Sequence, residues 1–417
     1  MPLDTKPGKV TCYDPSTLSV IGYAPAMSAE QVKELVDKSR AAQQQWSMTS
    51  FGERRRVLRL INKFILEHQD DICHVSMKDT GKTSVEALLG EILATCGKIA
   101  WMCDQGEAAL ATETRPTNPL TVHKLATVEY HPLGVIGVIA PWNYPFHNAY
   151  NHIISGLFAG NGVVIKVSEF TSYSAAYFER IIQTILAQAG HSPDLVSFVT
   201  GFTEAGAGLV SSGVDKVVFT GSPGIGKHVM RGASASLTPV VLELGGKDPF
   251  IICEDADMDQ VVQMALRGTY QNAGQNCVGA ERFYVYEPVH DDFVAKVTAI
   301  VSQFRQGPPL QCRDADIGAT VTPAQLQIIQ RLVDDAVAKG ATVHCGGKIN
   351  ADLAPGLFFE PTVLSGVTHD MDIANHEVFG PVMTIIKVNS DEQCLEMVNC
   401  TEYGLGSRLV LAPPPRS

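Results

Sequence analysis

The sequence has no hydrophobic run long enough to cross a bilayer, no CxxC pair among its ten cysteines, and no excess of basic residues. Without CxxC spacing, neither a zinc site nor a disulfide framework is expected, and the thiols indicate a reducing compartment such as the cytoplasm. The net charge of −12 argues against a nucleic-acid binder, because phosphate backbones need a basic face. The first residues lack the apolar core of a secretory signal, although a membrane anchor ahead of residue 1 in a longer product stays open.

The composition is that of a globular protein with more than one core. The chain has 417 residues, of which 45% are hydrophobic and 18% charged, and this length is comfortable for two domains. Short apolar runs alternate with helix-compatible segments, and this rhythm predicts an α/β fold with a doubly wound parallel sheet. The expected strands are 134–140, 162–167, 194–200, 215–220 and 239–244 in the first block, and 250–253, 282–286, 341–345 and 382–388 in a second α/β block.

The domain boundaries follow from these blocks. The beginning of the chain is predicted to be helical, with capping boxes at Ser28 and Ser50. Residues 112–132 alternate weakly between prolines and predict a β-hairpin arm. We therefore expect one domain over 1–111 and 133–245, the hairpin, a second domain over 246–407, and an atypical tail over 408–417.

The stretch "FTGSPGIGKH" (219–228) is close to a nucleotide-binding P-loop. Gly221, Gly226 and Lys227 fit that pattern, but His228 replaces the hydroxyl residue that would hold magnesium. The loop follows an expected strand and precedes an expected helix, so its amides are suited to a phosphate. The alternative is a glycine-rich turn without a ligand.

Three other motifs carry groups suited to covalent chemistry. Cys277 in "GQNC" lies among small residues that leave a thiol accessible, although free cysteines are more often structural. Glu243 interrupts an apolar strand and suits a general base if burial raises its pKa; the alternative is a salt-bridged or exposed strand end, with Lys247 as candidate partner. Asn143 in "PWNYP" is placed to donate to an oxyanion, or is an ordinary turn residue.

Two further motifs are weaker alone. Lys166 and Glu169 in "IKVSEF" follow the second strand, at the sheet edge where nucleotides bind, or are solvated loop charges. "NHEVFGP" combines Glu377 and Phe379 with a Gly-Pro turn, and by itself indicates only a turn.

Taken together and in this order, six motifs closely resemble those of the aldehyde dehydrogenase superfamily, and the resemblance covers residues 13–407. The motifs are "PWNYP", "IKVSE", "FTGSPGIG", "LELGGK", "GQNC" and "EVFGP". The phrases are most similar to the plant branch called family twenty-two. The resemblance implies that Cys277 is the nucleophile, that Asn143 and the Cys277 amide form the oxyanion site, and that Glu243 activates water.

The resemblance also implies an NAD-binding Rossmann-like first domain, with NADP as a possible substitute. Lys166 and Glu169 would contact the adenosine ribose, and Glu377 the nicotinamide ribose. The remaining implied contacts with the cofactor, near its pyrophosphate and nicotinamide, are Trp142, Gly221, Ser222 and Phe379.

The expected reaction is NAD(P)-dependent oxidation of a small-molecule aldehyde to a carboxylic acid, through a cysteine thiohemiacetal and a thioester. The resemblance implies a homo-dimer or tetramer joined by the hairpin. After "YGLGS" (403–407) the similarity ends, so we expect a C-terminally truncated form with an incomplete catalytic domain. The alternatives are a weakly active or inactive dimerising partner, a nucleotide hydrolase, and a cofactor-free cysteine hydrolase.

Overall fold

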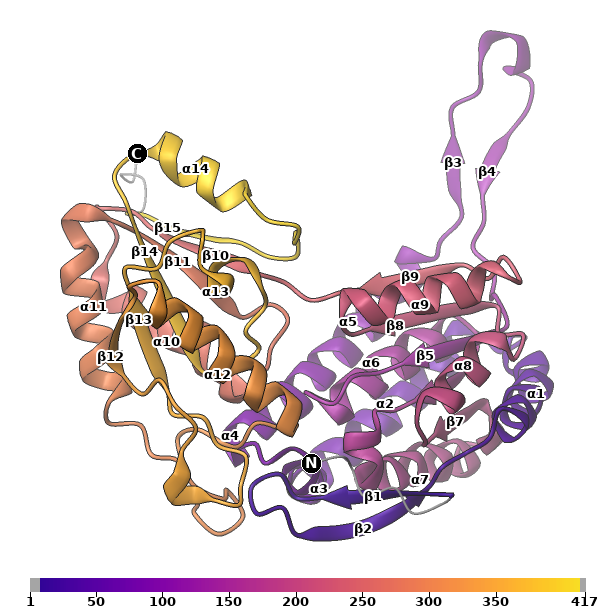
Figure 1. Ribbon diagram of the computed structural model, residues 1–417. Helices are drawn as coiled ribbons and strands as arrows, with labels where there is room; N and C mark the ends of the chain where they lie inside the picture. Colours follow the sequence, from indigo (N-terminus) through magenta and orange to yellow (C-terminus); the bar gives the residue numbers. More distant parts are fainter. Residues whose placement is uncertain (1–7, 413–417) are drawn as a thin grey trace.

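A computed structural model describes residues 8–412, which form two α/β units and a projecting hairpin (Figure 1). The first unit is built on a five-stranded sheet of order β7-β6-β5-β8-β9, in which all neighbouring strands are parallel. The predicted α/β fold with a doubly wound sheet is confirmed. The strands are β5 (Val135–Ile139), β6 (Gly162–Lys166), β7 (Val196–Val199), β8 (Lys216–Thr220) and β9 (Val240–Glu243).

Both faces of this sheet are covered by helices, which explains why its central strands lack polar alternation. In β6, Val163 and Ile165 pack into the core on one face, whereas Val164 packs into the core on the other. Helices α6 and α7 cover the first face, with α2, α3 and α5 behind them, and α1, α8 and α9 cover the second. These helices are α1 (Ala29–Trp46), α2 (Phe51–Glu67), α3 (Gln69–Thr80), α5 (Ala94–Ala109), α6 (Pro145–Phe158), α7 (Ser172–Gln188), α8 (Thr203–Ser211) and α9 (Pro223–Ser234).

The beginning of the chain differs from the expected run of helices. Before α1, β1 (Lys9–Tyr13) and β2 (Val20–Pro25) form an antiparallel hairpin. The capping box at Ser28 is complete, whereas Ser50 accepts the backbone N–H of Glu53 but the Glu53 carboxylate binds Arg56 and a histidine instead. Between α3 and α5 lie the short helix α4 (Ser84–Ala87) and a π-helical turn, Leu88–Leu93.

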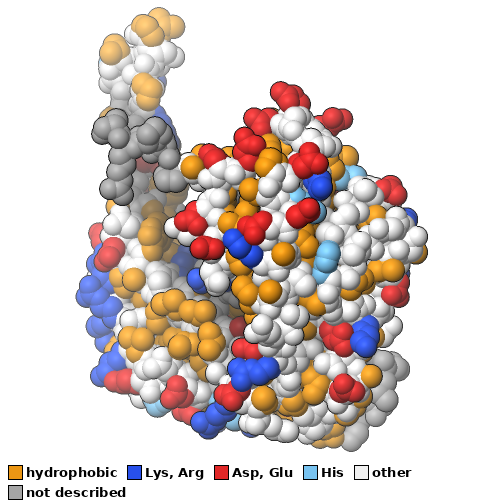
Figure 2. Space-filling view, turned by 90° about the vertical axis from the view of Figure 1, so that its left-hand side faces the viewer, with side chains coloured by type: hydrophobic (Ala, Val, Ile, Leu, Met, Phe, Trp, Pro, Cys, Tyr) orange, Lys and Arg blue, Asp and Glu red, His pale blue; other side chains and the backbone are white. Residues whose placement is uncertain are grey.

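A two-stranded antiparallel ribbon lies within residues 112–132 and stands away from both units (Figure 1). It consists of β3 (Glu113–Arg115) and β4 (Ala126–Val128). Figure 2 shows hydrophobic side chains at the end of the arm. The large apolar residues exposed in this segment are Leu120, Val122 and Leu125.

The second unit contains a six-stranded sheet of order β12-β13-β14-β11-β10-β15, parallel except at β12. Helices α10 and α11 cover one face, and α12 and α13 the other. The strands are β10 (Asp248–Ile252), β11 (Ala280–Tyr286), β12 (Thr342–Cys345), β13 (Thr362–Ser365), β14 (Val382–Val388) and β15 (Arg408–Val410). The helices are α10 (Met258–Tyr270), α11 (Glu287–Val301), α12 (Pro323–Ala338), α13 (Asp372–Asn375) and α14 (Asp391–Asn399).

Two strands of this sheet were not expected from the sequence. β13 is short and follows a proline, and β15 falls in the segment assigned to an atypical tail, whose last residues, 413–417, lie outside the described part. β15 pairs with β10 through Arg408, Leu409 and Val410, so this part of the tail belongs to the sheet. Within residues 8–412, no helix is long and apolar enough to span a membrane.

Candidate functional site

The loop before Cys277 has an unusual backbone that is held from several sides. Asn272 and Ala273 both adopt left-handed conformations, with φ of 57° and 54°. The Asn272 backbone N–H donates to the buried carboxylate of Glu86 at 2.7 Å, and its side-chain amide donates to the Asn143 carbonyl at 3.0 Å. Strained residues of this kind persist where the surroundings determine them, and they cluster at functional sites.

Gln275 connects this loop to Asn143. Its side chain is 1% exposed, accepts the Val321 N–H at 2.8 Å and donates to the Ala319 carbonyl at 3.2 Å. Its own carbonyl accepts the side-chain amide of Asn143 at 3.2 Å. The Asn143 amide is therefore held against the backbone of Gln275, two residues before Cys277.

Three predicted motifs meet at Gly246. A side-chain carbon at this position would lie 2.5 Å from the carbonyl oxygen of Cys277, so only glycine allows the two loops to approach so closely. The Gly246 N–H donates to the Glu377 carboxylate at 3.2 Å. The preceding Gly245 has φ of 86° and also packs against that carboxylate. "LELGGK", "GQNC" and "EVFGP" thus form one site.

The pKa values of the two ionisable groups at this meeting point, Glu377 and Cys277, are both raised. Burial, with the nearby charge of Glu281, raises the pKa of Glu377 to about 8. Burial and the charge of Glu377 raise the pKa of the Cys277 thiol, against a smaller lowering by backbone N–H groups. The thiol is therefore the resting form, and the Glu377 carboxyl is the acid whose charge acts on it most strongly.

Glu281 and Lys247 form a buried ion pair that supports the site. The Lys247 ammonium donates to Glu281 at 2.6 Å, and the same carboxylate accepts the backbone N–H groups of Val378 and Phe379. The turn carrying Glu377 and Phe379 is thereby held against β11. Lys247 is engaged with Glu281, so the alternative in which it pairs with Glu243 is not observed.

Glu243 lies at the end of β9 with an exposed side chain, so the expected burial of this carboxylate is not observed. Its backbone carbonyl accepts the Gly221 N–H at 2.9 Å, which connects it to the glycine-rich loop. Glu243 is three residues before Gly246, but the carboxyl groups whose charges raise the pKa of the Cys277 thiol are those of Glu377 and Asp248.

A second buried network lies beneath Asn143. The Lys82 ammonium donates to Glu91 and to the Asn143 carbonyl, both at 2.7 Å, and lies 4.3 Å from the centre of the Tyr144 ring. Glu91, in the π-helical turn, is fully buried and also accepts the His147 backbone N–H at 2.9 Å. The Tyr144 hydroxyl is buried and has no hydrogen-bond partner among residues 8–412.

The glycine-rich loop follows β8 and leads into α9, as its sequence predicts. Ser222 is the residue before the helix, and its side chain makes no capping hydrogen bond. The first amides of α9 are thus available to an anion, such as a cofactor pyrophosphate. A side-chain carbon at Gly226 would lie 2.5 Å from Leu244, so glycine is needed where α9 packs on the strand end.

The remaining predicted cofactor residues form two pairs. The Lys166 ammonium, at the end of β6, lies 3.5 Å from the Glu169 carboxylate, and burial lowers its pKa. The Trp142 and Phe379 rings meet edge to face with centroids 5.4 Å apart, and Phe379 has φ of 49°. Phe379 comes from the second unit and Trp142 from the first, so this contact spans both.

Sequence reasoning missed the supporting residues, which are Lys82, Glu86, Glu91, Asn272, Gln275 and Glu281. Each is at most 7% exposed, although most are charged. The signal that drew attention to Glu243, a charge next to apolar residues, also applies to Glu281 in "GAERFYVY". Lys82 lies in the loop after α3, and Glu86 and Glu91 lie in α4 and the π-helical turn, where a charge is normally solvated.

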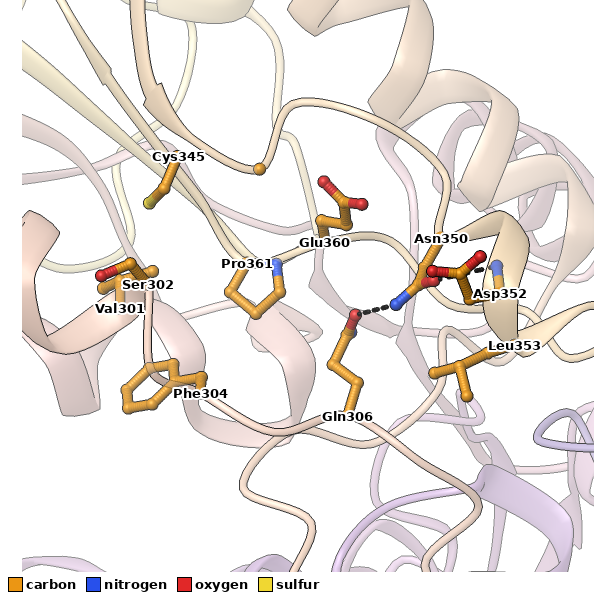
Figure 3. Close-up of a pocket in the computed structure, with 11 residues that line it drawn as sticks. Val301, Ser302, Phe304, Gln306, Cys345, Asn350, Asp352, Leu353, Glu360 and Pro361 are labelled. Carbon is orange, nitrogen blue, oxygen red and sulfur yellow. Dashed lines mark hydrogen bonds between the residues drawn. The ribbon is translucent and has the colours of Figure 1, made fainter.

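A cavity of about 340 Å³ opens elsewhere in the second unit (Figure 3). It is lined from residues 301–306, 345–353 and 360–361, and a hydrogen bond of 3.1 Å joins Asn350 to Gln306 across it. This lining is separate from the residues around Cys277.

Comparisons with known proteins agree with this geometry. The chain matches the model of the aldehyde dehydrogenase family over residues 3–412. A putative aldehyde dehydrogenase-like protein of Schizosaccharomyces pombe is 39% identical, covering 95% of this chain and 77% of the relative. The chloroplastic betaine aldehyde dehydrogenase of Beta vulgaris is 35% identical, covering 96% and 81%.

Solved structures are similar over almost the whole described chain. Succinate-semialdehyde dehydrogenase from Burkholderia pseudomallei has a TM-score of 0.90 at 34% identity, covering 97% of this chain and 82% of that structure. Mycobacterium tuberculosis aldehyde dehydrogenase complexed with NAD⁺ has a TM-score of 0.91 at 30% identity, covering 98% and 83%. The narrower placement beside the plant branch stays a prediction.

Proposed function

Because this chain belongs to the aldehyde dehydrogenase family, a family of oxidoreductases, we propose that it oxidises an aldehyde to a carboxylic acid through the thiol of Cys277, with NAD as the hydride acceptor. The observation that carries this proposal is the meeting of Cys277, Gly246 and Glu377, with the Asn143 amide held against the same loop. The structural neighbour that contains NAD⁺ supports the choice of cofactor.

The fit of a dinucleotide rests on features of this chain. The amides at the start of α9 suit the pyrophosphate, and Lys166 with Glu169 at the sheet edge suits the adenosine ribose. Glu377 would contact the other ribose, and Phe379 and Trp142, whose rings meet edge to face, would lie beside the nicotinamide ring. NAD, when bound, accepts the hydride released from the aldehyde carbon.

The chemistry then divides between the residues as follows. The Cys277 thiol gives up its proton to solvent, its sulfur bonds to the aldehyde carbon, and the carbonyl oxygen, now negative, accepts from the Asn143 amide and the Cys277 N–H. An asparagine amide has two N–H donors, of which one is used by Gln275. Loss of hydride leaves a thioester on Cys277, and water activated by Glu243 hydrolyses it and releases the acid.

The first test follows NADH absorbance with a panel of aliphatic and aromatic aldehydes. We expect NADH formation by the wild type and none by Cys277→Ala. A Cys312→Ala variant is a matched control, because Cys312 is a thiol remote from the site loops. NADH formation that survives Cys277→Ala would contradict the proposal.

The relatives do not determine the substrate. The name of the Beta vulgaris protein refers to a cationic aldehyde and that of the Burkholderia structure to an anionic one. The relatives therefore support the class of reaction proposed for this chain, and not a particular aldehyde.

We also propose that the hairpin joins two copies of the chain. Its tip exposes Leu120 at 88%, Val122 at 76% and Leu125 at 79% in a segment without a core of its own, and isolated two-stranded ribbons are marginally stable. Replacing Leu120 and Val122 by Asp is expected to shift the mass measured by light scattering towards the monomer. An unchanged mass would exclude this role for the tip.

A further inference from the structure

Helix α6 carries a polar stripe that begins beside the Asn143 amide. Its half-buried positions recur at helical spacing and are all polar: His147, Asn148, Asn151, His152 and Ser155. The Asn148 amide donates to the Asn143 side-chain oxygen at 3.0 Å. His152 follows Asn148 by one helical turn, about 6 Å along the axis. The stripe therefore leads away from the point where the aldehyde oxygen would bind.

A lysine from the neighbouring helix faces this stripe. Helix α5 packs against α6, and Lys98 on α5 is half-buried, which lowers its pKa. Burial also lowers the pKa of His147, and that of His152 to about 4, and in both the charge of Lys98 contributes. Lys98, His147 and His152 thus form one cluster, in which Lys98 carries the positive charge.

The acidic groups near this cluster are already engaged. Glu91 is the carboxylate that acts on His147, but it accepts the Lys82 ammonium and the His147 backbone N–H. In the described part of the chain, no carboxylate forms an ion pair with Lys98, His147 or His152. A half-buried ammonium without a counter-charge favours an anion at this position.

The hydrogen bonds of His147 determine its tautomer. The Thr95 hydroxyl lies 3.0 Å from Nδ1 of His147 and donates its only proton to the Glu91 carbonyl. Nδ1 must therefore carry the proton of the neutral ring, and Nε2 can take up a second proton when an anion binds nearby.

We propose that the substrate is an ω-oxo acid, an aldehyde with a distal carboxylate, and that Lys98 binds this carboxylate with His152 and His147 beside it. The inference rests on the proposed function, since it places the aldehyde group at Asn143 and Cys277. A cationic aldehyde would be repelled by Lys98, and a neutral one would leave the ammonium with only the Trp101 ring, whose centre lies 5.6 Å away.

The test compares three substrates of similar length on the full chain: 4-oxobutanoate, its methyl ester, and 4-aminobutanal. For the wild type, we expect kcat/KM for 4-oxobutanoate to exceed that for the ester by at least tenfold, with 4-aminobutanal the poorest. Lys98→Met is expected to lower the acid-to-ester ratio about tenfold. Lys98→Arg and Lys63→Met, the latter on exposed α2, are expected to keep the ratio.

Two outcomes would overturn the inference and leave the reaction class intact: equal kcat/KM for acid and ester in the wild type, or a ratio unchanged by Lys98→Met. Absence of NADH with every aldehyde would instead contradict the proposed function.

Binding alone can be tested even without turnover. Succinate has the same distal carboxylate and is expected to raise the Tm of Cys277→Ala, whereas succinamide is expected not to. The shift should disappear in Cys277→Ala/Lys98→Met. A succinate shift of equal size in both proteins would overturn the inference.

Discussion

The ammonium of Lys82 lies 2.7 Å from the backbone carbonyl oxygen of Asn143, and the same ammonium is paired with Glu91 at 2.7 Å. A buried ion pair thus holds the loop that presents the oxyanion donor. Both charged side chains are at most 1% exposed, so each depends on the other for its neutralisation.

Replacing Lys82 by Met is expected to destabilise the protein by about 3–5 kcal/mol, because the Glu91 carboxylate would be left buried without its cation. Urea unfolding measures this. Lys63→Met is the control, since Lys63 and Glu67 form an exposed pair at 3.7 Å that is worth about 0–1 kcal/mol. The double variant Lys82→Met/Glu91→Leu should recover much of the loss. Equal unfolding midpoints for the two lysine variants would exclude a stabilising role for the buried pair.

Glu243→Gln is expected to separate the two halves of the reaction. Hydride transfer precedes hydrolysis of the thioester, so the variant should give one equivalent of NADH rapidly and then turn over about 10²–10⁴-fold more slowly. Rapid mixing with detection of NADH absorbance measures the burst, which Cys277→Ala should lack.

Glu377→Gln is the informative comparison for that experiment, because the Glu377 carboxyl accepts the N–H of Gly246, the residue that packs on the Cys277 carbonyl. A normal steady state in Glu243→Gln together with a burst followed by slow turnover in Glu377→Gln would transfer the role of base to Glu377.

The pKa of Glu377, raised to about 8 by burial and by the charge of Glu281, predicts a pH-dependent stability without cofactor. Between the pKa of an ordinary Glu in the unfolded chain and pH 8, the folded state binds the additional proton. The free energy of unfolding of the wild type should therefore fall as pH rises through this window, relative to Glu377→Gln, by at most about 1.4 kcal/mol per pH unit.

Urea unfolding at several pH values between 5 and 9 gives this difference. Glu67→Gln, at the exposed end of α2, is the control and should follow the wild type. A constant difference between the wild type and Glu377→Gln across the window would show that Glu377 is not protonated in the folded protein.

Cofactor preference is expected to depend on Glu169. A carboxylate about 4 Å from a 2′-phosphate costs about 4 kcal/mol at an effective dielectric near 20, and about a third of this is still roughly tenfold. NAD should therefore bind about tenfold more tightly than NADP, and Glu169→Gln should reduce this difference. Titrations of both cofactors measure the ratio, and equal affinities in the wild type would exclude the effect.

The sequence by itself determined the α/β character of the fold, and it predicted most residues of the candidate site. Buried parallel strands need continuous apolar runs, so β5 to β9 were recognisable from local composition. Cys277, Asn143 and Glu377 lie in short motifs whose residue types are rare together, and Gly245 and Gly246 are required by a close approach that few other residues permit.

The tertiary structure decided what these residues contact. Lys82 and Asn143 are 61 positions apart, and Lys247 and Glu281 are 34 apart, so no local pattern reveals either pairing. The exposure of the Glu243 side chain depends on where β9 ends, and in this structure the side chain is exposed. Lys98, His147 and His152 become neighbours only when α5 packs on α6, because electrostatic interactions depend on distance through space and not along the chain.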